Sequence, residues 1–262
     1  GPGSMNAGRP PLLEVRAQGL YCPAGEFYID PRRPVPRAVV THAHADHARP
    51  GSGAYLAQRD SAALLRQRLG ASIHLETLAY GETRTVNGVA VSLHPAGHIR
   101  GSAQIRLDRR GEVWVVTGDF KTEADPTCAP FEPQTCRTLV MEATFGLPVF
   151  RWPRPEAVLE QIHAWWRDNR AAGRASLLQV YALGKAQRVL QGLAPHQGPI
   201  VAHEAVEAIN RLYREGGVAL PATLPEAALQ DRGLLAHCLV LLPPAAAGRP
   251  GRPVLSGASR AL

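Results

Sequence analysis

The stretch Thr41-His42-Ala43-His44-Ala45-Asp46-His47 places three imidazoles and one carboxylate within seven residues. Imidazole and carboxylate are the usual ligands of zinc and other transition metals in proteins. The preceding segment, Arg37-Ala38-Val39-Val40, predicts a short buried strand that opens into a loop at Thr41. On a strand, His42 and His44 would face the same way. The stretch therefore predicts a metal site at a strand end, although histidine-rich surface loops also arise by chance.

The order of His42, His44, Asp46 and His47 resembles the HxHxDH signature of the metallo-β-lactamase superfamily. The resemblance implies an α/β fold, a four-layer αβ/βα sandwich with a dinuclear metal site at one edge. Asp46 and His47 would then face a second ion beside the first.

Length and composition are compatible with one large domain, or a domain with an insertion, and with a cytoplasmic protein. No run of about 18 apolar residues and no signal-peptide pattern is present, so we expect no membrane segment. The four cysteines form no CxxC pair and are expected to be reduced thiols. Residues 1–4 read as the remnant of an expression tag, so we expect the native protein to start at Met5.

The chain is strongly basic, with a formal net charge of +7 and a pI near 9.7. Nearly all of its positive charge comes from arginine, because Lys121 and Lys185 are the only lysines. A basic surface favours a polyanionic partner such as nucleic acid. A compositional bias of the source genome would also exchange lysine for arginine, so charge alone leaves both explanations open.

Further polar residues follow other predicted strands. Asp30 ends the strand predicted at Glu26–Ile29, where it could orient a metal-binding histidine without touching the ion. An Asx turn would use an aspartate there equally well. Between the strands, Asp60–Leu69 has helical spacing, with Asp60 as the expected N-cap and Gly70 as the stop.

Two hairpins lead to the next candidate ligands. Asn87-Gly88 is a strong hairpin signal, and a second hairpin is expected about residues 109–111. The segment Ala96-Gly97-His98-Ile99-Arg100-Gly101-Ser102 resembles the AGHxxGS segment of the nuclease branch of the superfamily, which implies that His98 is a ligand. Asp119 follows an apolar strand and, by the same resemblance, bridges both ions.

An acid also ends the strand predicted from Leu139, namely Glu142. It resembles the acid that opens the β-CASP region of nucleic-acid-processing members, although a glutamate in an ordinary turn would look the same. We therefore expect five strand ends to converge on one edge, carrying Asp30, the histidine stretch, His98, Asp119 and Glu142.

The domain boundaries follow from a change in pattern. We assign residues 5–145 to the first part of the metallo-β-lactamase domain and residues 146–233 to an inserted β-CASP-like lobe of βαβ units. At residues 234–262 the chain is expected to return to the metallo-β-lactamase domain. The family's SDHxD and THG motifs do not follow, so the first domain is expected to be truncated in this chain.

Within the lobe, Tyr181–Gln187 resembles the G(K/R)xQ loop-to-helix element of β-CASP domains. Lys185 would add a cation to a helix start, which suits a phosphate, although a solvated lysine is an equally good explanation. We predict nucleic-acid contacts from Lys185, Gln187 and Arg100.

As a whole, the chain most resembles the bacterial ligase-associated DNA exonucleases. This implies a metal-dependent DNA exonuclease of DNA repair that acts on single-stranded DNA or a free end, with an ATP-dependent DNA ligase and a helicase as partners. One divalent ion would be held by His42, His44 and His98 and the other by Asp46, His47 and Asp119, with Asp46, His98 and Asp119 taking part in catalysis. Zinc, manganese and iron all suit these ligands, and two such ions activate a water to attack a backbone phosphate.

Two alternatives stay open at this point. The first is another enzyme on the same metal site, either an RNA-processing nuclease or a thioester or lactone hydrolase. The second is a nucleic-acid-binding protein with an incomplete, inactive metal site.

Overall fold

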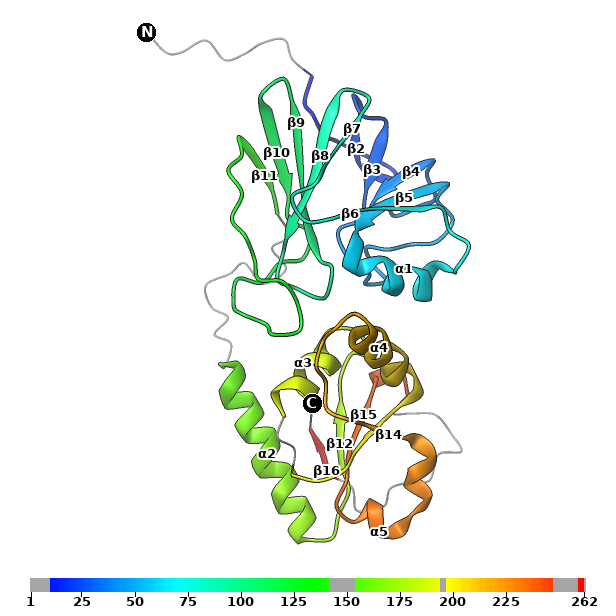
Figure 1. Cartoon of the computed structure of the whole chain (residues 1–262), viewed down its shortest axis with the longest axis vertical. Coiled ribbons are helices and arrows are strands. Elements are labelled where there is room, and N and C mark those ends of the chain that lie inside the picture. Colours follow the sequence, from blue (N-terminus) through cyan, green and yellow to red (C-terminus); the bar gives the residue numbers. More distant parts are fainter. Residues whose placement is uncertain (1–9, 142–153, 194–196, 247–258, 262) are drawn as a thin grey trace. The chain divides into compact units, whose positions relative to one another are not determined.

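The computed structural model describes residues 10–141, 154–193, 197–246 and 259–261. It divides into two compact units (Figure 1), the first being Gly1–Ala124 with Cys128–Glu142 and the second Asp125–Thr127 with Ala143–Leu262. Both helices and sheets are present, so the chain is a mixed α/β protein. Among the described helices, none has the length and hydropathy needed to cross a membrane.

Unit 1 contains two sheets. The first has the order β1-β2-β3-β4-β5-β6, antiparallel from β1 to β3 and parallel from β3 to β6. Its strands are β1 Glu14–Arg16, β2 Gly19–Cys22, β3 Phe27–Ile29, β4 Arg37–Val39, β5 Ala54–Gln58 and β6 Leu75–Leu78. The second has the order β11-β10-β9-β8-β7, antiparallel except for the parallel pair of β10 and β11. Its strands are β7 Thr83–Val86, β8 Val89–Pro95, β9 Ala103–Arg109, β10 Glu112–Val116 and β11 Thr138–Val140.

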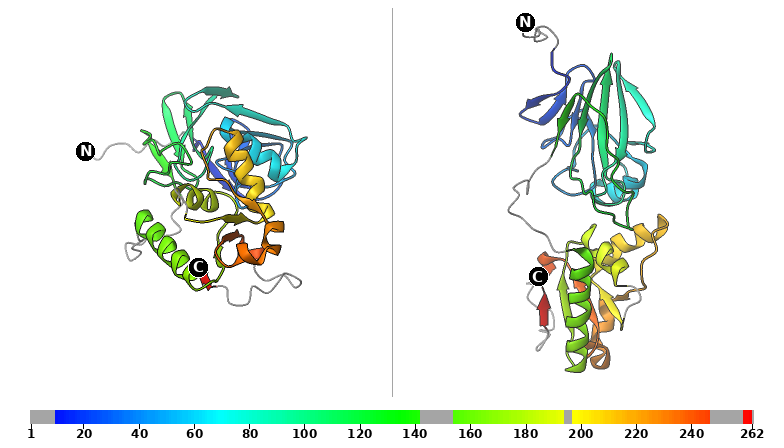
Figure 2. Two further views of the ribbon diagram at one scale, coloured as in Figure 1. Left: turned by 60° about the horizontal axis from the view of Figure 1, so that its bottom comes forward. Right: turned by 90° about the vertical axis from the view of Figure 1, so that its left-hand side faces the viewer.

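The core of unit 1 lies between these two sheets, whose ribbons face each other in Figure 2. Alternate residues of a strand point to the same face, and Val89, Val91 and Leu93 of β8 follow this rule and are fully buried. They pack in one cluster with residues of the first sheet such as Phe27 and Val39. Burial of this apolar surface holds the sheets face to face, so the loops at their ends are carried by a rigid frame.

Both predicted hairpins are present. Asn87 and Gly88 have φ of 47° and 78°, and Arg110 and Gly111 have φ of 55° and 80°. Positive φ at both central residues is the type I′ pattern, whose twist matches that of the flanking strands.

The predicted helix begins differently from our expectation. A 3₁₀ turn at Arg59–Ser61 precedes α1, Ala62–Leu69, and the Gln58 side chain accepts a hydrogen bond from the backbone N–H of Asp60. Asp60 is therefore not the N-cap, because Gln58, two residues earlier, caps the 3₁₀ turn and Ser61 is the N-cap of α1. Gly70 ends the helix as predicted, with its N–H bonded to the Arg66 carbonyl.

Unit 2 is built on a parallel sheet with the order β14-β13-β15-β12-β16. Its strands are β12 Ser176–Gln179, β13 Ile200–Ala202, β14 Leu224–Pro225, β15 Leu239–Leu242 and β16 Ser259–Ala261, and its helices are α2 Pro155–Ala171, α3 Lys185–Gly192, α4 Glu204–Glu215 and α5 Arg232–Leu235. Short 3₁₀ turns lie at Glu226–Gln230 and Pro244–Ala246. One face of the sheet packs on residues of α2, α3 and α4, and the other on residues near α5.

The strand that we expected to return to the first domain lies elsewhere. β15 is the central strand of the unit 2 sheet, paired with β12 on one side and β13 on the other. All four of its residues are buried, and their alternate side chains enter the clusters on the two faces. An apolar run covered on both faces is typical of a central parallel strand, so this segment completes unit 2.

Candidate metal centre

Polar residues from four strand ends of unit 1 meet at one place. Asp30 follows β3, the histidine stretch follows β4, His98 lies between β8 and β9, and Asp119 follows β10. Backbone hydrogen bonds join these loops, from Ala103 N to the Thr41 carbonyl at 2.8 Å and from Lys121 N to the Ala96 carbonyl at 2.9 Å. The fifth predicted member, Glu142, lies outside the described residues.

His42, His44, His98 and Asp119 form a group whose ligand atoms all lie within 4.8 Å of one another. His98 Nε2 is 3.1 Å from His44 Nδ1. His42 is only 1% exposed, and its Nε2 is buried without a hydrogen-bond partner. A buried nitrogen that lacks a partner costs free energy unless something binds it, so this group has the donors and the geometry to hold a metal ion.

The tautomer of His42 is fixed by a chain of hydrogen bonds. The Thr41 hydroxyl donates to Asp30 Oδ2 at 2.5 Å, and its oxygen is 3.0 Å from His42 Nδ1. A hydroxyl has one proton, so Thr41 must accept from His42 Nδ1–H once it donates to the carboxylate. The lone pair of His42 then lies on Nε2, the atom that faces Asp119 Oδ2 at 3.8 Å.

His47 is held from the same carboxylate. Its Nδ1 is 2.7 Å from Asp30 Oδ2, and its Nε2 is 3.5 Å from Asp46 Oδ2 and 3.4 Å from Asp119 Oδ1. The two oxygens of Asp119 therefore face different partners, Oδ1 toward His47 and Oδ2 toward His42 and His98. Asp119 thus offers one oxygen to each of two groups of neighbours.

Burial and neighbouring charges set the protonation of the group. Burial, with the neighbouring histidines, lowers the pKa of His42 well below its usual value and lowers the pKa of His98 to about 4. Burial also opposes protonation of His47, but hydrogen bonds and charge from Asp119 and Asp30 prevail and raise its pKa to about 10. The hydrogen bond from His47 is in turn the main cause that lowers the pKa of Asp119. A proton on His47 then supplies positive charge between Asp30 and Asp119.

Two glycines allow the ligand loops to approach neighbouring residues closely. A Cβ on Gly118, whose φ is +54°, would lie 2.7 Å from Cβ and Oγ1 of Thr41. A Cβ on Gly97, whose φ is +73°, would lie 2.3 Å from the Lys121 carbonyl. Asp119 and His98 reach the centre only because these positions have no side chain.

Three residues that position the centre had no role in the sequence analysis. The Thr41 hydroxyl links the Asp30 carboxylate to His42 by two hydrogen bonds. The Ser102 hydroxyl accepts hydrogen bonds from the backbone N–H groups of His98 and Ile99, and the Tyr80 hydroxyl donates to the Ser102 carbonyl at 2.8 Å. The hydroxyls of Thr41 and Ser102 sit inside the quoted motifs and could have been noticed there, whereas nothing in the sequence marks Tyr80.

The residues predicted to contact nucleic acid differ in their surroundings. Arg100 is partly buried, two residues after His98, with a nitrogen 3.5 Å from Asp60 Oδ1. Lys185 is exposed at the start of α3. Gln187 is fully buried, and its amide bonds the Gly184 N–H, the Ala182 carbonyl and Asn210. That prediction for Gln187 is wrong, because the side chain fixes the turn into α3 and has no exposed surface.

Sequence comparison finds relatives that are much longer proteins, and this chain matches one part of each. A protein of Opitutus terrae named "Probable DNA ligase" is 34% identical over 208 residues, which are 78% of this chain and 20% of that protein. Endoribonuclease YSH1 of Kluyveromyces lactis is 32% identical over 120 residues, 44% of this chain and 15% of that protein. The chain thus spans a fifth or less of either relative. No protein-family model matches it.

Structure comparison finds a similar fold. A crystal structure of a protein of unknown function from Enterococcus faecalis matches with a TM-score of 0.58. The match covers 79% of this chain and 58% of the chain in that crystal structure. Sequence identity is 13%, so the match concerns the fold alone.

Proposed function

Because the chain belongs to the metallo-β-lactamase/β-CASP superfamily of nucleases, we propose that it is a metal-dependent phosphodiesterase that removes nucleotides from a free end of DNA. We assign to it the four-layer domain of that superfamily, with unit 2 as the β-CASP lobe. The single observation that carries the proposal is the placement of Asp119 between His47 on one side and His42 and His98 on the other.

Two divalent ions fit these donors. We propose that His42, His44 and His98 hold one ion and Asp46 and His47 the other, with Asp119 shared by both. When bound, zinc, manganese or iron ions would supply a water of lowered pKa and neutralise the charge on the phosphate. The unpartnered Nε2 of His42 supports this assignment.

The protein's own residues have three tasks in this proposal. Asp30 orients His47 directly and His42 through Thr41, so both imidazoles present Nε2 to the ions. Asp46, whose side chain is 72% exposed, is able to accept a proton from the attacking water and pass it to solvent. His98 and Asp119 complete the rigid set of donors, which fixes the position of the reacting phosphate.

Positive charge near the centre suits a phosphate backbone. Arg100 is two residues from His98, and we propose that it contacts a phosphate rather than a base. We propose a phosphate contact for Lys185 as well, which belongs to unit 2. The similarity to a protein named as a probable DNA ligase supports DNA as the substrate. We also propose a DNA ligase and a helicase as partners in repair, which is what the family resemblance implies.

A second candidate is an RNA-processing nuclease, which the similarity to an endoribonuclease favours. The site chemistry is the same for both substrates, because a metal-assisted attack on phosphorus does not require the 2′-hydroxyl. The substrate must therefore be decided by a direct comparison of matched DNA and RNA strands.

Metal binding and cleavage are tested together. Metal content of the purified protein is measured by elemental analysis, and cleavage of end-labelled single strands is followed with added Mn²⁺ or Zn²⁺. The proposal expects Asp119→Asn to lose both bound metal and mononucleotide release while its circular dichroism spectrum stays unchanged. Faster cleavage of RNA would favour the second candidate, and bound metal without cleavage of either strand would contradict both.

A further inference from the structure

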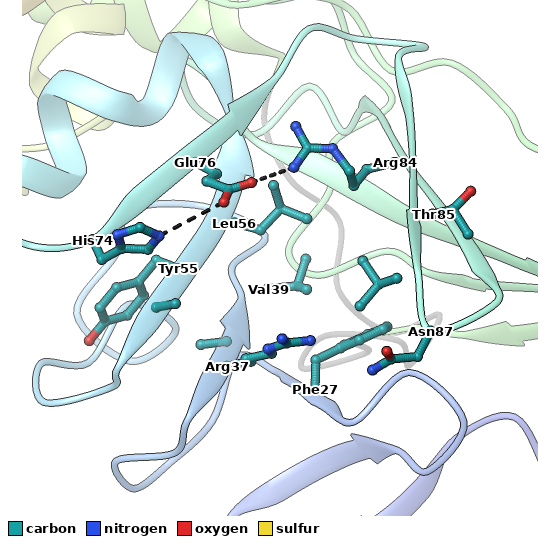
Figure 3. Close-up of a pocket in the computed structure, with 13 residues that line it drawn as sticks. Phe27, Arg37, Val39, Tyr55, Leu56, His74, Glu76, Arg84, Thr85 and Asn87 are labelled. Atoms are coloured by element: carbon teal, nitrogen blue, oxygen red, sulfur yellow. Dashed lines mark hydrogen bonds and ion pairs between the residues drawn. The ribbon is translucent and has the colours of Figure 1, made fainter.

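Unit 1 contains a second cavity, of about 370 Å³, away from the candidate metal centre (Figure 3). It begins at Arg37, at the amino end of β4, whereas the histidine stretch follows the carboxyl end of that strand. The rest of its lining comes from Phe27, β5, the start of β6, and the hairpin of β7. No residue of the candidate metal centre lines it, so the proposed nuclease chemistry does not use this cavity.

The cavity is the open seam between two sheet edges, and we refer to it as the β6–β7 seam. Register pairs Val39 with Leu56 and Leu56 with Glu76, and residues paired in this way share a face of their sheet. Arg84 and Val86 of β7 form the other wall. Strands β6 and β7 are each the last strand of their sheet, so both walls end in an edge strand.

The seam combines an apolar floor with a charged rim. Phe27 and Val39 are 2% and 3% exposed, and Leu56 and Val86 pack against the same core cluster. Leu56 and Val86 are only half-buried, so they leave apolar surface open to an incoming side chain.

On the rim, Glu76 makes an ion pair with Arg84 and lies 3.8 Å from His74 Nε2 (Figure 3). Arg37 is exposed and has no ion pair or side-chain hydrogen bond within the part of the chain that the structure describes. The lining thus contains two guanidinium groups and one carboxylate, and that carboxylate pairs with Arg84, so the positive charge of Arg37 is not compensated by it.

We propose that the β6–β7 seam binds an extended, acidic segment of a partner protein. Residues i and i+2 of an extended segment point to the same side, about 7 Å apart. An apolar side chain can then rest on Leu56 and Val86 while a carboxylate two residues away pairs with Arg37.

The test uses a phage-displayed library of random heptapeptides and the whole chain as target. Enriched peptides are expected to carry a large apolar residue two positions from an aspartate or glutamate. A synthetic, fluorescein-labelled copy is then titrated by anisotropy. Arg37→Glu should weaken its binding by about tenfold or more, and a peptide with lysine in place of that acid should bind Arg37→Glu better than it binds the wild type.

The matched control is Arg110→Glu, which makes the same charge change at an exposed turn outside the seam. It should leave binding unchanged. Equal loss in both variants would reduce the effect to overall charge and overturn the proposal. So would a library without the acidic and apolar pair, or displacement of the peptide by hexanoate at concentrations near the peptide's own Kd, which would assign the seam to a small amphipathic anion. Nuclease activity is independent of these outcomes, because Arg37 has no part in the metal centre.

Discussion

The carboxylate of Asp30 lies 2.7 Å from Nδ1 of His47, and the other ring nitrogen of His47, Nε2, faces Asp119. The His47 ring therefore lies between two carboxylates. Asp30 orients the ring, and Asp119 would bind the same metal ion as His47. Because Asp30 also accepts the Thr41 hydroxyl, one side chain positions two of the histidines in the centre.

Asp30→Asn should weaken metal binding without removing any proposed ligand. An amide offers one acceptor oxygen where the carboxylate offers two, so His47 and Thr41 lose a shared acceptor. Residues that orient metal ligands from behind typically contribute roughly 10–100-fold in affinity, and a loss in that range is expected in chelator competition. Asp108→Asn is the control, because Asp108 bonds only locally in the β9–β10 hairpin. Equal affinities of wild type and Asp30→Asn would show that the relay has no effect on binding.

Metal binding should release a proton at neutral pH. The pKa of His47 is raised to about 10 in the metal-free protein, so its Nε2 is protonated at pH 7 and must lose that proton to bind an ion. His42 and His98, whose pKa values are lowered, are already neutral. Calorimetry in buffers of different ionisation enthalpy should report about one proton released per protein, with affinity rising as pH increases toward 10. The release should vanish in His47→Asn, and a pH-independent affinity between 7 and 9 would contradict the assignment.

The same shift affects the stability of the metal-free protein. Because the pKa of His47 is higher in the folded than in the unfolded protein, its protonation stabilises the folded state. This stabilisation is complete at pH values below the unfolded-state pKa, near 6.5 for histidine, and is lost as pH rises toward 10. The metal-free wild type should therefore lose thermal stability between pH 7 and pH 10 relative to His47→Asn. Bound metal should remove this difference, and parallel curves for the metal-free proteins would contradict a raised pKa.

Gly118→Ala should destabilise unit 1 more than Gly111→Ala does. Both glycines have positive φ, but only at Gly118 would the new Cβ meet another residue, Thr41, whereas Gly111 has nothing within 4 Å. Overpacking of this kind typically costs about 1–3 kcal/mol beyond the conformational strain. Urea denaturation of the two variants isolates that difference, and equal losses would show that the loop moves freely away from Thr41.

Gln187→Ala and Lys185→Ala should separate stability from nucleic-acid binding. Gln187 is buried and fully bonded, so its loss should lower the free energy of unfolding by about 1–3 kcal/mol. Lys185→Ala should leave stability unchanged, weaken single-stranded DNA binding and lower the salt slope by about 1. Anisotropy across a salt series checks this, and unchanged affinity in Lys185→Ala would remove that residue from the interface.

The site was more accessible to sequence reasoning than the chain's organisation. Ligand-type residues at strand ends could be predicted, because apolar strands such as Val113–Val116 and hairpin signals such as Asn87-Gly88 are local. The location of β15 could not, because its run of leucines and valines suits the centre of any parallel sheet. Which sheet it joins depends on pairing with β12 and β13, far away in sequence.

The burial of polar side chains was the second feature that the sequence could not predict. Gln187 follows an exposed lysine and matched a nucleic-acid motif, but its partner Asn210 is 23 residues away. Thr41 was quoted without a role because its function depends on Asp30, which reaches it only after the first sheet forms. Such contacts follow from tertiary structure and leave no periodic signal.

We propose above all that His42, His44, His98 and Asp119 hold metal for a nuclease reaction, and one measurement tests this most directly. Single-stranded DNA labelled at either end is incubated with Mn²⁺ and with wild type or His98→Ala protein, and the products are resolved by length. We expect the wild type to release mononucleotides from one end and His98→Ala, still folded by circular dichroism, to release none. Equal release by both proteins, or none by a wild type shown to hold metal, would contradict the claim.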